Sequence, residues 1–148
     1  MENWTIRRAD TGDAECLGRC FDAAYAQYAE RIDDLPPMSE NCAEEIAEYL
    51  VWVAEAGGTI VGGLVLVPSD GFLLLANVAV HPDHRGAGLG RRLLTLAETE
   101  ARNRGYAELR LNTHEGMAEN IRHYARKGWS PMSQEGKKVT MRKDLPRP

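Results

Sequence analysis

Residues 85–90, with the sequence Arg-Gly-Ala-Gly-Leu-Gly, combine residue types and spacing that predict a definite chemical task. They follow an apolar run at 72–80, typical of a buried strand, and precede residues 91–104, whose apolar spacing predicts an amphipathic helix. The first N–H groups of a helix have no partner within it, and the helix dipole adds partial positive charge there. Glycine lets a ligand approach the backbone closely. The segment therefore predicts a binding turn for a pyrophosphate.

The spacing excludes two other phosphate-binding motifs. A P-loop needs glycine followed by Lys and then Ser or Thr, and no glycine of this chain is followed by those two residues. The dinucleotide motif needs G-x-G-x-x-G, whereas the glycines here stand at 86, 88 and 90. The pattern that fits is R-x-x-G-x-G, from Arg85 to Gly90.

Three segments in the right order resemble the GNAT superfamily of acyl-CoA-dependent N-acyltransferases. That family binds the coenzyme A pyrophosphate with R-x-x-G-x-G. Residues 77–82, Asn-Val-Ala-Val-His-Pro, are similar to its central strand and exit, and residues 120–129 to its N-x-x-x-Y-x-x-x-G-[F/W] helix and turn. The resemblance implies an α/β (α+β) GNAT fold over one domain, residues 1–148. Its single mixed, mostly antiparallel sheet of six to seven strands would be flanked by about four helices, with a parallel central pair splayed around the cofactor.

The resemblance also implies the co-substrate, acetyl-CoA, and the residues that hold it. No metal is expected. The predicted coenzyme A-binding residues are Val78, Ala79, Val80, Arg85, Gly86, Ala87, Gly88, Leu89, Gly90, Arg91, Asn120 and Tyr124. The backbone of Val78 and Val80 would pair with the pantetheine arm, and a backbone N–H near Val78 or Ala79 would face the thioester oxygen. A solvated helix face explains Arg91 equally well.

Tyr124 is the predicted general acid, placed by resemblance at the coenzyme A sulfur. A phenol with a pKa of about 10 can hydrogen-bond a thiolate whose parent thiol has a pKa of about 8.5. The alternative is a core aromatic, because Ile121 and Tyr124 lie three residues apart on one expected helix.

The base that deprotonates the amine is less well marked. Asn77 stands near the position where many family members carry glutamate, and an amide cannot take the proton. The substitutes are Glu55, His81, His114 and Glu115, or an ordered water held by Asn77 and backbone carbonyls. We favour the water, and on this basis Asn77 is counted with Tyr124 among the catalytic residues.

An antiparallel meander followed by a crossover must position these groups. Strands are expected at 4–8, 51–56, 59–67, 72–80 and 107–113, with a final hairpin at 129–132 and 138–142. Helices are expected after a cap at Asp10 or Thr11, from Ser39 or Asn41 through Leu50, at 91–104 and at 118–127. The crossover predicts that strand 107–113 lies parallel to strand 72–80.

The acyl acceptor is expected between the first two helices and the loop joining them. Tyr28 and Arg31 are the predicted substrate residues, beside Glu30, Asp33 and Asp34. The acids suit an ammonium and Arg31 a carboxylate, so an amino-acid-like amine or a small polyamine would fit. An exposed charged loop is an equally good interpretation.

Composition limits the setting and the partners. The chain has 148 residues, a net charge of −4 and no apolar run of the ~20 residues that span a bilayer. It shows no signal peptide, so we expect a cytoplasmic protein without nucleic-acid or membrane partners. Three cysteines without a C-x-x-C pair argue for reduced thiols. The C-terminal strands and an exposed sheet edge offer a surface for a homodimer.

The function predicted from these features is transfer of an acetyl group from acetyl-CoA to a small-molecule primary amine, by direct attack in a ternary complex. Two alternatives stay open: a protein or peptide N-acetyltransferase, and a non-catalytic coenzyme A-binding module.

Overall fold

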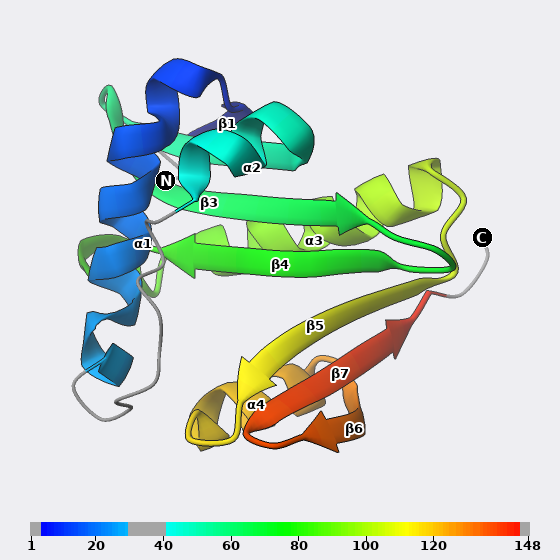
Figure 1. Ribbon diagram of the computed structural model, residues 1–148. Coiled ribbons are helices and arrows are strands. Elements are labelled where there is room, and N and C mark those ends of the chain that lie inside the picture. The colour runs from blue at the N-terminus through cyan, green and yellow to red at the C-terminus, as the bar shows by residue number, and fades with distance from the viewer. Residues whose placement is uncertain (1–3, 30–40, 146–148) are drawn as a thin grey trace.

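One seven-stranded sheet organises the protein. The computed structural model describes residues 4–29 and 41–145 (Figure 1). The strand order is β1-β2-β3-β4-β5-β7-β6, with β4 and β5 parallel and all other neighbouring pairs antiparallel. The strands are β1 (Thr5–Arg8), β2 (Leu50–Ala56), β3 (Thr59–Pro68), β4 (Leu73–Val80), β5 (Glu108–His114), β6 (Ser130–Glu135) and β7 (Lys138–Asp144). The predicted GNAT topology, with its parallel central pair, is confirmed.

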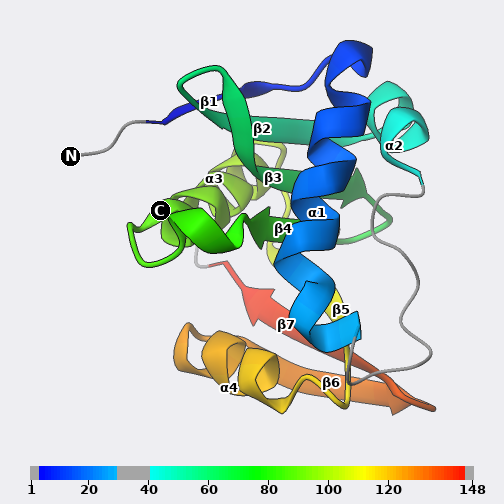
Figure 2. The same cartoon turned by 90° about the vertical axis from the view of Figure 1, so that its left-hand side faces the viewer.

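Helices cover both faces of this sheet. Figure 2 shows α1 and α2 on one face and α3 and α4 on the other. The helices are α1 (Ala14–Ala29), α2 (Cys42–Glu48), α3 (Leu89–Asn103) and α4 (Ala118–Arg126). No helix in the described part of the chain is long and apolar enough to cross a membrane.

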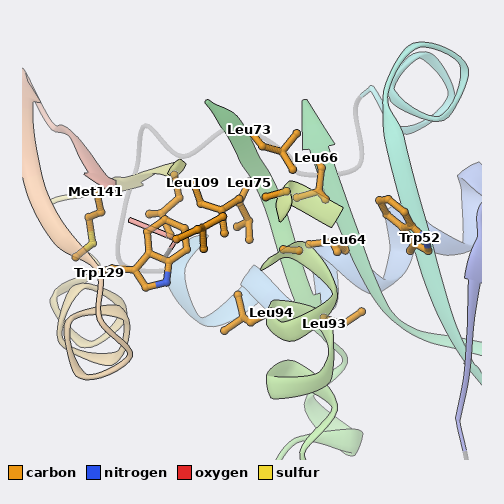
Figure 3. Packing of buried hydrophobic residues seen from close by; sticks show 14 of the residues in the cluster. Trp52, Leu64, Leu66, Leu73, Leu75, Leu93, Leu94, Leu109, Trp129 and Met141 are labelled. Carbon is orange, nitrogen blue, oxygen red and sulfur yellow. The ribbon is translucent and has the colours of Figure 1, made fainter. Parts of the chain in front are cut away.

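Two hydrophobic layers result from the alternation of side chains along the strands. Leu64 and Leu66 of β3 lie with Leu93 of α3 in one layer, whose packing Figure 3 shows. Val65, between those two leucines, joins Phe21 of α1 in the other layer. Successive strand residues point to opposite faces, so the central strands are apolar on both. Each fully buried leucine stabilises the fold by about 1.5–3 kcal/mol.

The predicted element boundaries hold at most places, and one is wrong. Asp10 caps the first helical turn by accepting a hydrogen bond from the Gly12 N–H, as expected. The second helix does not continue through Leu50: it ends at Glu48, because Tyr49 is extended and Leu50 already begins β2. Leu50 therefore belongs to a strand, although its spacing from Ile46 also fits a helical period.

Two of the three cysteines are buried thiols. Burial raises the pKa of both Cys20 and Cys42 to about 11, so they are protonated near neutral pH. Cys16 is exposed.

Candidate active site

The two parallel strands separate soon after they meet. They pair only where Leu73–Leu75 run beside Leu109–Leu111. Beyond that point β4 continues to Val80 beside β3, and β5 continues to His114 beside β7 (Figure 1). The facing edges of β4 and β5 therefore leave backbone groups without a strand partner, available to an extended ligand.

A bulge in β4 sets the direction of the side chains along this opening. Leu75 pairs with Leu66 and Asn77 pairs with Val65, so Ala76 is the additional residue. In a regular strand Leu75 and Asn77, two apart, would share a face. The bulge reverses that pattern: Leu75 lies in the layer on the α3 side, whereas Asn77 faces α1.

The loop from β4 to α3 has the open backbone that a pyrophosphate requires. Gly86 has φ +84° and Gly88 has φ +90°, a region that side chains with a Cβ rarely adopt. A Cβ added at either glycine would meet no atom within 4 Å, so the loop surface is open to a ligand. Gly88 is the N-cap of α3, which begins at Leu89, and the first N–H groups of this helix point toward the loop. The residues present fit a pyrophosphate.

A cavity of about 620 Å³ lies over this loop and is called the loop cavity here. All the predicted coenzyme A-binding residues except Ala87 line it, together with residues of α1 and α4: Ala24, Tyr25, Val78, Ala79, Val80, His84, Arg85, Gly86, Gly88, Leu89, Gly90, Arg91, Leu94, Glu119, Asn120, His123, Tyr124, Arg126 and Lys127.

The loop cavity is cationic although the chain carries a net charge of −4. Among the residues that the structure describes, Arg85, Arg91, Arg126 and Lys127 line it with a single acid, Glu119. The Arg85 guanidinium also donates to the Ala24 carbonyl oxygen at 2.8 Å, which joins the loop to α1. It has five N–H donors, so the bond to α1 leaves donors for a phosphate.

The pKa of His123 responds to burial first and to the neighbouring cations second. Burial and the charges of Lys127 and Arg126 lower the pKa of His123 below its usual value, so the imidazole is neutral near pH 7.

A second cavity of about 530 Å³ adjoins the first and is called the strand-end cavity here. It lies where β4 and β5 diverge and reaches the turn between β6 and β7. Its lining residues are Tyr25, Leu75, Ala76, Asn77, Val78, Leu111, Asn112, Thr113, His114, Met117, Asn120, Tyr124, Glu135, Lys137 and Lys138. Tyr25, Val78, Asn120 and Tyr124 line both cavities and mark their junction.

Tyr124 and Asn120 lie at this junction on successive turns of α4. The Tyr124 ring packs edge-on against Trp129, with 5.7 Å between ring centroids, so a core contact fixes its plane. The ring is half-buried and borders both cavities. Tyr124 therefore packs in the core, as one interpretation of the sequence expected, and also lines the site, as the other expected. The Asn120 amide donates to the Met117 sulfur at 3.6 Å.

Of the four side chains considered as bases, only His114 lines either cavity. Glu55 accepts a hydrogen bond from Arg7 on β1. His81 caps the short turn after β4, its Nδ1 accepting from the Asp83 N–H at 3.1 Å.

The other two candidates are also held by neighbours. Glu115 is exposed and accepts from the Gln134 amide at 2.7 Å. The His114 Nδ1 accepts from the Gly116 N–H at 2.9 Å, so its ring proton is on Nε2. That bond occupies the nitrogen lone pair with which the neutral ring would accept a proton.

Tyr28 and Arg31, the predicted substrate residues, lie outside the residues whose side chains are described, as do Glu30, Asp33 and Asp34. Sequence reasoning missed Tyr25, whose hydroxyl donates to the Asn77 Oδ1 at 3.1 Å across 52 positions of the chain. Tyr25 belongs to an aromatic stripe on α1, and its helical spacing gives no sign of this contact.

The comparisons with known proteins agree with this geometry. Residues 15–129 match the model of the acetyltransferase (GNAT) family. The chain is 32% identical over 111 residues to the L-methionine sulfoximine/L-methionine sulfone acetyltransferase of Salmonella typhimurium, covering 68% of this chain. It is 36% identical over 118 residues to the IAA acetyltransferase of Azospirillum brasilense, covering 72% of this chain and 77% of that protein. The match spans 65% of the Salmonella enzyme, slightly less than two thirds of its length.

The fold is similar to that of a solved acetyltransferase. The PaiA N-acetyltransferase of Thermoplasma acidophilum, in complex with coenzyme A, superimposes with a TM-score of 0.81 at 22% identity. The comparison covers 97% of this chain and 99% of that one.

Proposed function

We propose that this chain, which belongs to the GNAT acetyltransferase family, transfers the acetyl group of acetyl-CoA to the primary amine of a small molecule. The observation that carries this proposal is the junction of two cavities at Tyr25, Val78, Asn120 and Tyr124. Two substrates entering from opposite sides would meet there, as direct transfer in a ternary complex requires.

Coenzyme A would occupy the loop cavity. Its pyrophosphate would lie on the backbone of residues 86–90, with charge supplied by Arg85 and Arg91. The pantetheine arm would extend along the free edge of β4, hydrogen-bonded to the backbone of Val78 and Val80. The carbon of the thioester would then lie at the junction, next to Tyr124. The glycine backbone and the four cationic side chains support this placement.

The reaction forms one bond and breaks another at the thioester carbon. The amine nitrogen attacks this carbon while a backbone N–H near Val78 or Ala79 stabilises the oxygen as its charge develops. The C–S bond then breaks, the nitrogen gives up a proton, and the departing thiolate receives a proton from the Tyr124 phenol. Solvent restores the phenol proton.

The nitrogen would lose its proton to a water molecule in the strand-end cavity. The bonds held by Glu55, His81, His114 and Glu115 support a water over any of these side chains.

A small molecule is the acceptor that we propose. The Salmonella relative is named for two amino-acid derivatives. The alternatives, a peptide acceptor or coenzyme A binding without catalysis, would give turnover on peptides alone or no turnover at all. Pairing of two copies along the exposed edge strand β6 stays a prediction.

Thiol release with acetyl-CoA and a panel of amino acids, polyamines, aminoglycosides and peptides tests the proposal. Tyr124→Phe removes only the hydroxyl and should lower kcat by about 100-fold, with an unchanged affinity for coenzyme A. Tyr106→Phe is the matched control, because Tyr106 packs against the same core and lines neither cavity. Coenzyme A binding without turnover on any amine would instead support the binding module.

A further inference from the structure

The hydrogen bond from Tyr25 to Asn77 fixes the direction of an amide at the strand-end cavity. The Tyr25 hydroxyl lies 3.1 Å from the Asn77 Oδ1 and 3.3 Å from the Val78 carbonyl oxygen. A phenol that donates to this oxygen leaves the NH2 group of the amide on the opposite side. The β4 bulge makes the contact possible, because it turns Asn77 toward α1 and away from the layer that holds Leu75.

The NH2 group of Asn77 is directed toward the strand-end cavity. Within residues 4–29 and 41–145, its Nδ2 has no hydrogen-bond partner, and no unpartnered side-chain nitrogen is sealed from solvent there. Asn77 lines the strand-end cavity and does not line the loop cavity. Its donor therefore faces the space that we assign to the acyl acceptor.

The other charged side chains described around this cavity favour an anion. Lys137 and Lys138 line it against one acid, Glu135, and Glu135 lies 3.6 Å from the Lys138 ammonium. An ammonium placed here would meet the NH2 of Asn77 and two lysines, whereas a carboxylate would receive a hydrogen bond from the NH2 of Asn77.

We propose that Tyr25 is a positioning residue that directs the Asn77 NH2 toward the acyl acceptor, and that the acceptor carries a carboxylate beside its amine to receive this donor. The inference rests on the proposed function. It selects an amino-acid-like acceptor over a polyamine, and gives Asn77 the role of a specificity residue.

Matched acceptor pairs test the need for a carboxylate. We would compare kcat/KM for L-methionine, L-phenylalanine and L-lysine with that for 3-(methylthio)propylamine, phenethylamine and cadaverine, their decarboxylated counterparts. Spermidine and an aminoglycoside complete the panel. Loss of a charge-assisted hydrogen bond lowers binding by about 10- to 100-fold, so the wild-type enzyme should prefer an amino acid by about 100-fold.

Two conservative variants test the residues. Asn77→Asp keeps an oxygen for Tyr25 and replaces the NH2 with a second oxygen, so the preference should fall by about 100-fold or reverse. Tyr25→Phe removes the group that fixes the amide, so the preference for the carboxylate-bearing member of each pair should fall by about tenfold. A purely structural role for Tyr25 would lower kcat/KM equally for both members of a pair. Melting temperatures confirm folding, and Tyr106→Phe again serves as the control.

The outcomes separate this inference from the proposed function. Equal turnover of both members of each pair, or turnover restricted to amines without a carboxylate, overturns the inference and leaves the proposed function standing. A preference that survives in Asn77→Asp overturns the role of Asn77. No thiol release with any member of the panel overturns the proposed function, and the inference with it.

Discussion

The two cavities differ in how the chain builds them. Much of the lining of the loop cavity comes from one continuous stretch, residues 78–91. In this stretch the backbone, opened by Gly86 and Gly88, forms the surface for the ligand. The strand-end cavity takes its surface from side chains of α1, β4, β5, α4 and the turn between β6 and β7. A backbone surface depends on a short local pattern, whereas a side-chain surface depends on how distant elements pack.

This difference has a functional consequence. A cofactor shared by a whole family can be recognised by a fixed backbone loop. An acceptor that differs between members needs side chains that change independently, and such side chains lie on separate elements. Changes that do not touch the shared junction should therefore affect one cavity and leave the other largely intact, and the predictions below test that independence.

The largest effect is expected from Gly88→Val. A β-branched residue at φ +90° is strained, and its side chain would occupy the surface on which the pyrophosphate lies. Loss of one or two charge-assisted hydrogen bonds should raise the Kd for coenzyme A by about 100-fold in calorimetry. Gly58→Val is the control, because Gly58 has φ +81° in the β2–β3 hairpin and lines neither cavity. An equal loss of affinity in both variants would contradict the assignment of the loop.

Two adjacent glycines of β3 allow a sharper test. A Cβ at Gly63 would come within 2.4 Å of Leu17 on α1, and a Cβ at Gly62 within 3.0 Å of Leu89 on α3. Overpacking of this kind costs about 1–3 kcal/mol. Gly63→Ala displaces the helix that carries Tyr25, so it should reduce kcat/KM for the amine more than affinity for coenzyme A.

Gly62→Ala should show the opposite pattern, because Leu89 begins the helix beside the loop cavity. Steady-state kinetics in both substrates, with chemical denaturation for stability, measures the two effects. If both variants change the same kinetic parameter, the two cavities are coupled and the comparison fails.

The sequence predicts the loop cavity better than the strand-end cavity, because the loop cavity is built from residues close together in the chain. Gly86, Gly88 and Gly90 lie in one local turn, so their spacing alone indicates the loop. The parallel pairing of β4 with β5 follows from a crossover helix, which is also a local feature. Both predictions depend on residues that are near each other in the chain.

The strand-end cavity shows where such reasoning stops. The contact between Tyr25 and Asn77 depends on a bulge at Ala76, and an additional residue in a strand leaves no mark in an apolar run such as 72–80. Likewise, Glu55 becomes unsuitable as a base because Arg7 pairs with it across β1 and β2, a register that only the folded sheet defines.

A smaller effect is expected from His114→Asn. If water accepts the amine proton, the pH profile of kcat/KM should keep its shape, because the ring accepts from Gly116 through Nδ1 and carries its proton on Nε2. His81→Asn is the control and should also leave the profile unchanged, since asparagine can cap the same turn. A titration near pH 6.5 that disappears in His114→Asn alone would identify His114 as the base.

The smallest effect concerns His123 and the charge of the loop cavity. Its pKa in the folded protein is lowered, so the unfolded state binds the proton more readily. Stability should therefore fall as the pH drops below about 6.5, the ordinary pKa of histidine, toward the lower pKa of the folded state. Between pH 7 and that lower pKa, the melting temperature of the wild-type protein should fall as the pH falls. The melting temperature of His123→Gln should fall less over the same range. Bound coenzyme A should reduce the difference, because its phosphates offset Lys127 and Arg126. An unchanged difference with coenzyme A would place the phosphates away from α4, and would separate the pyrophosphate loop from the cationic side of the cavity.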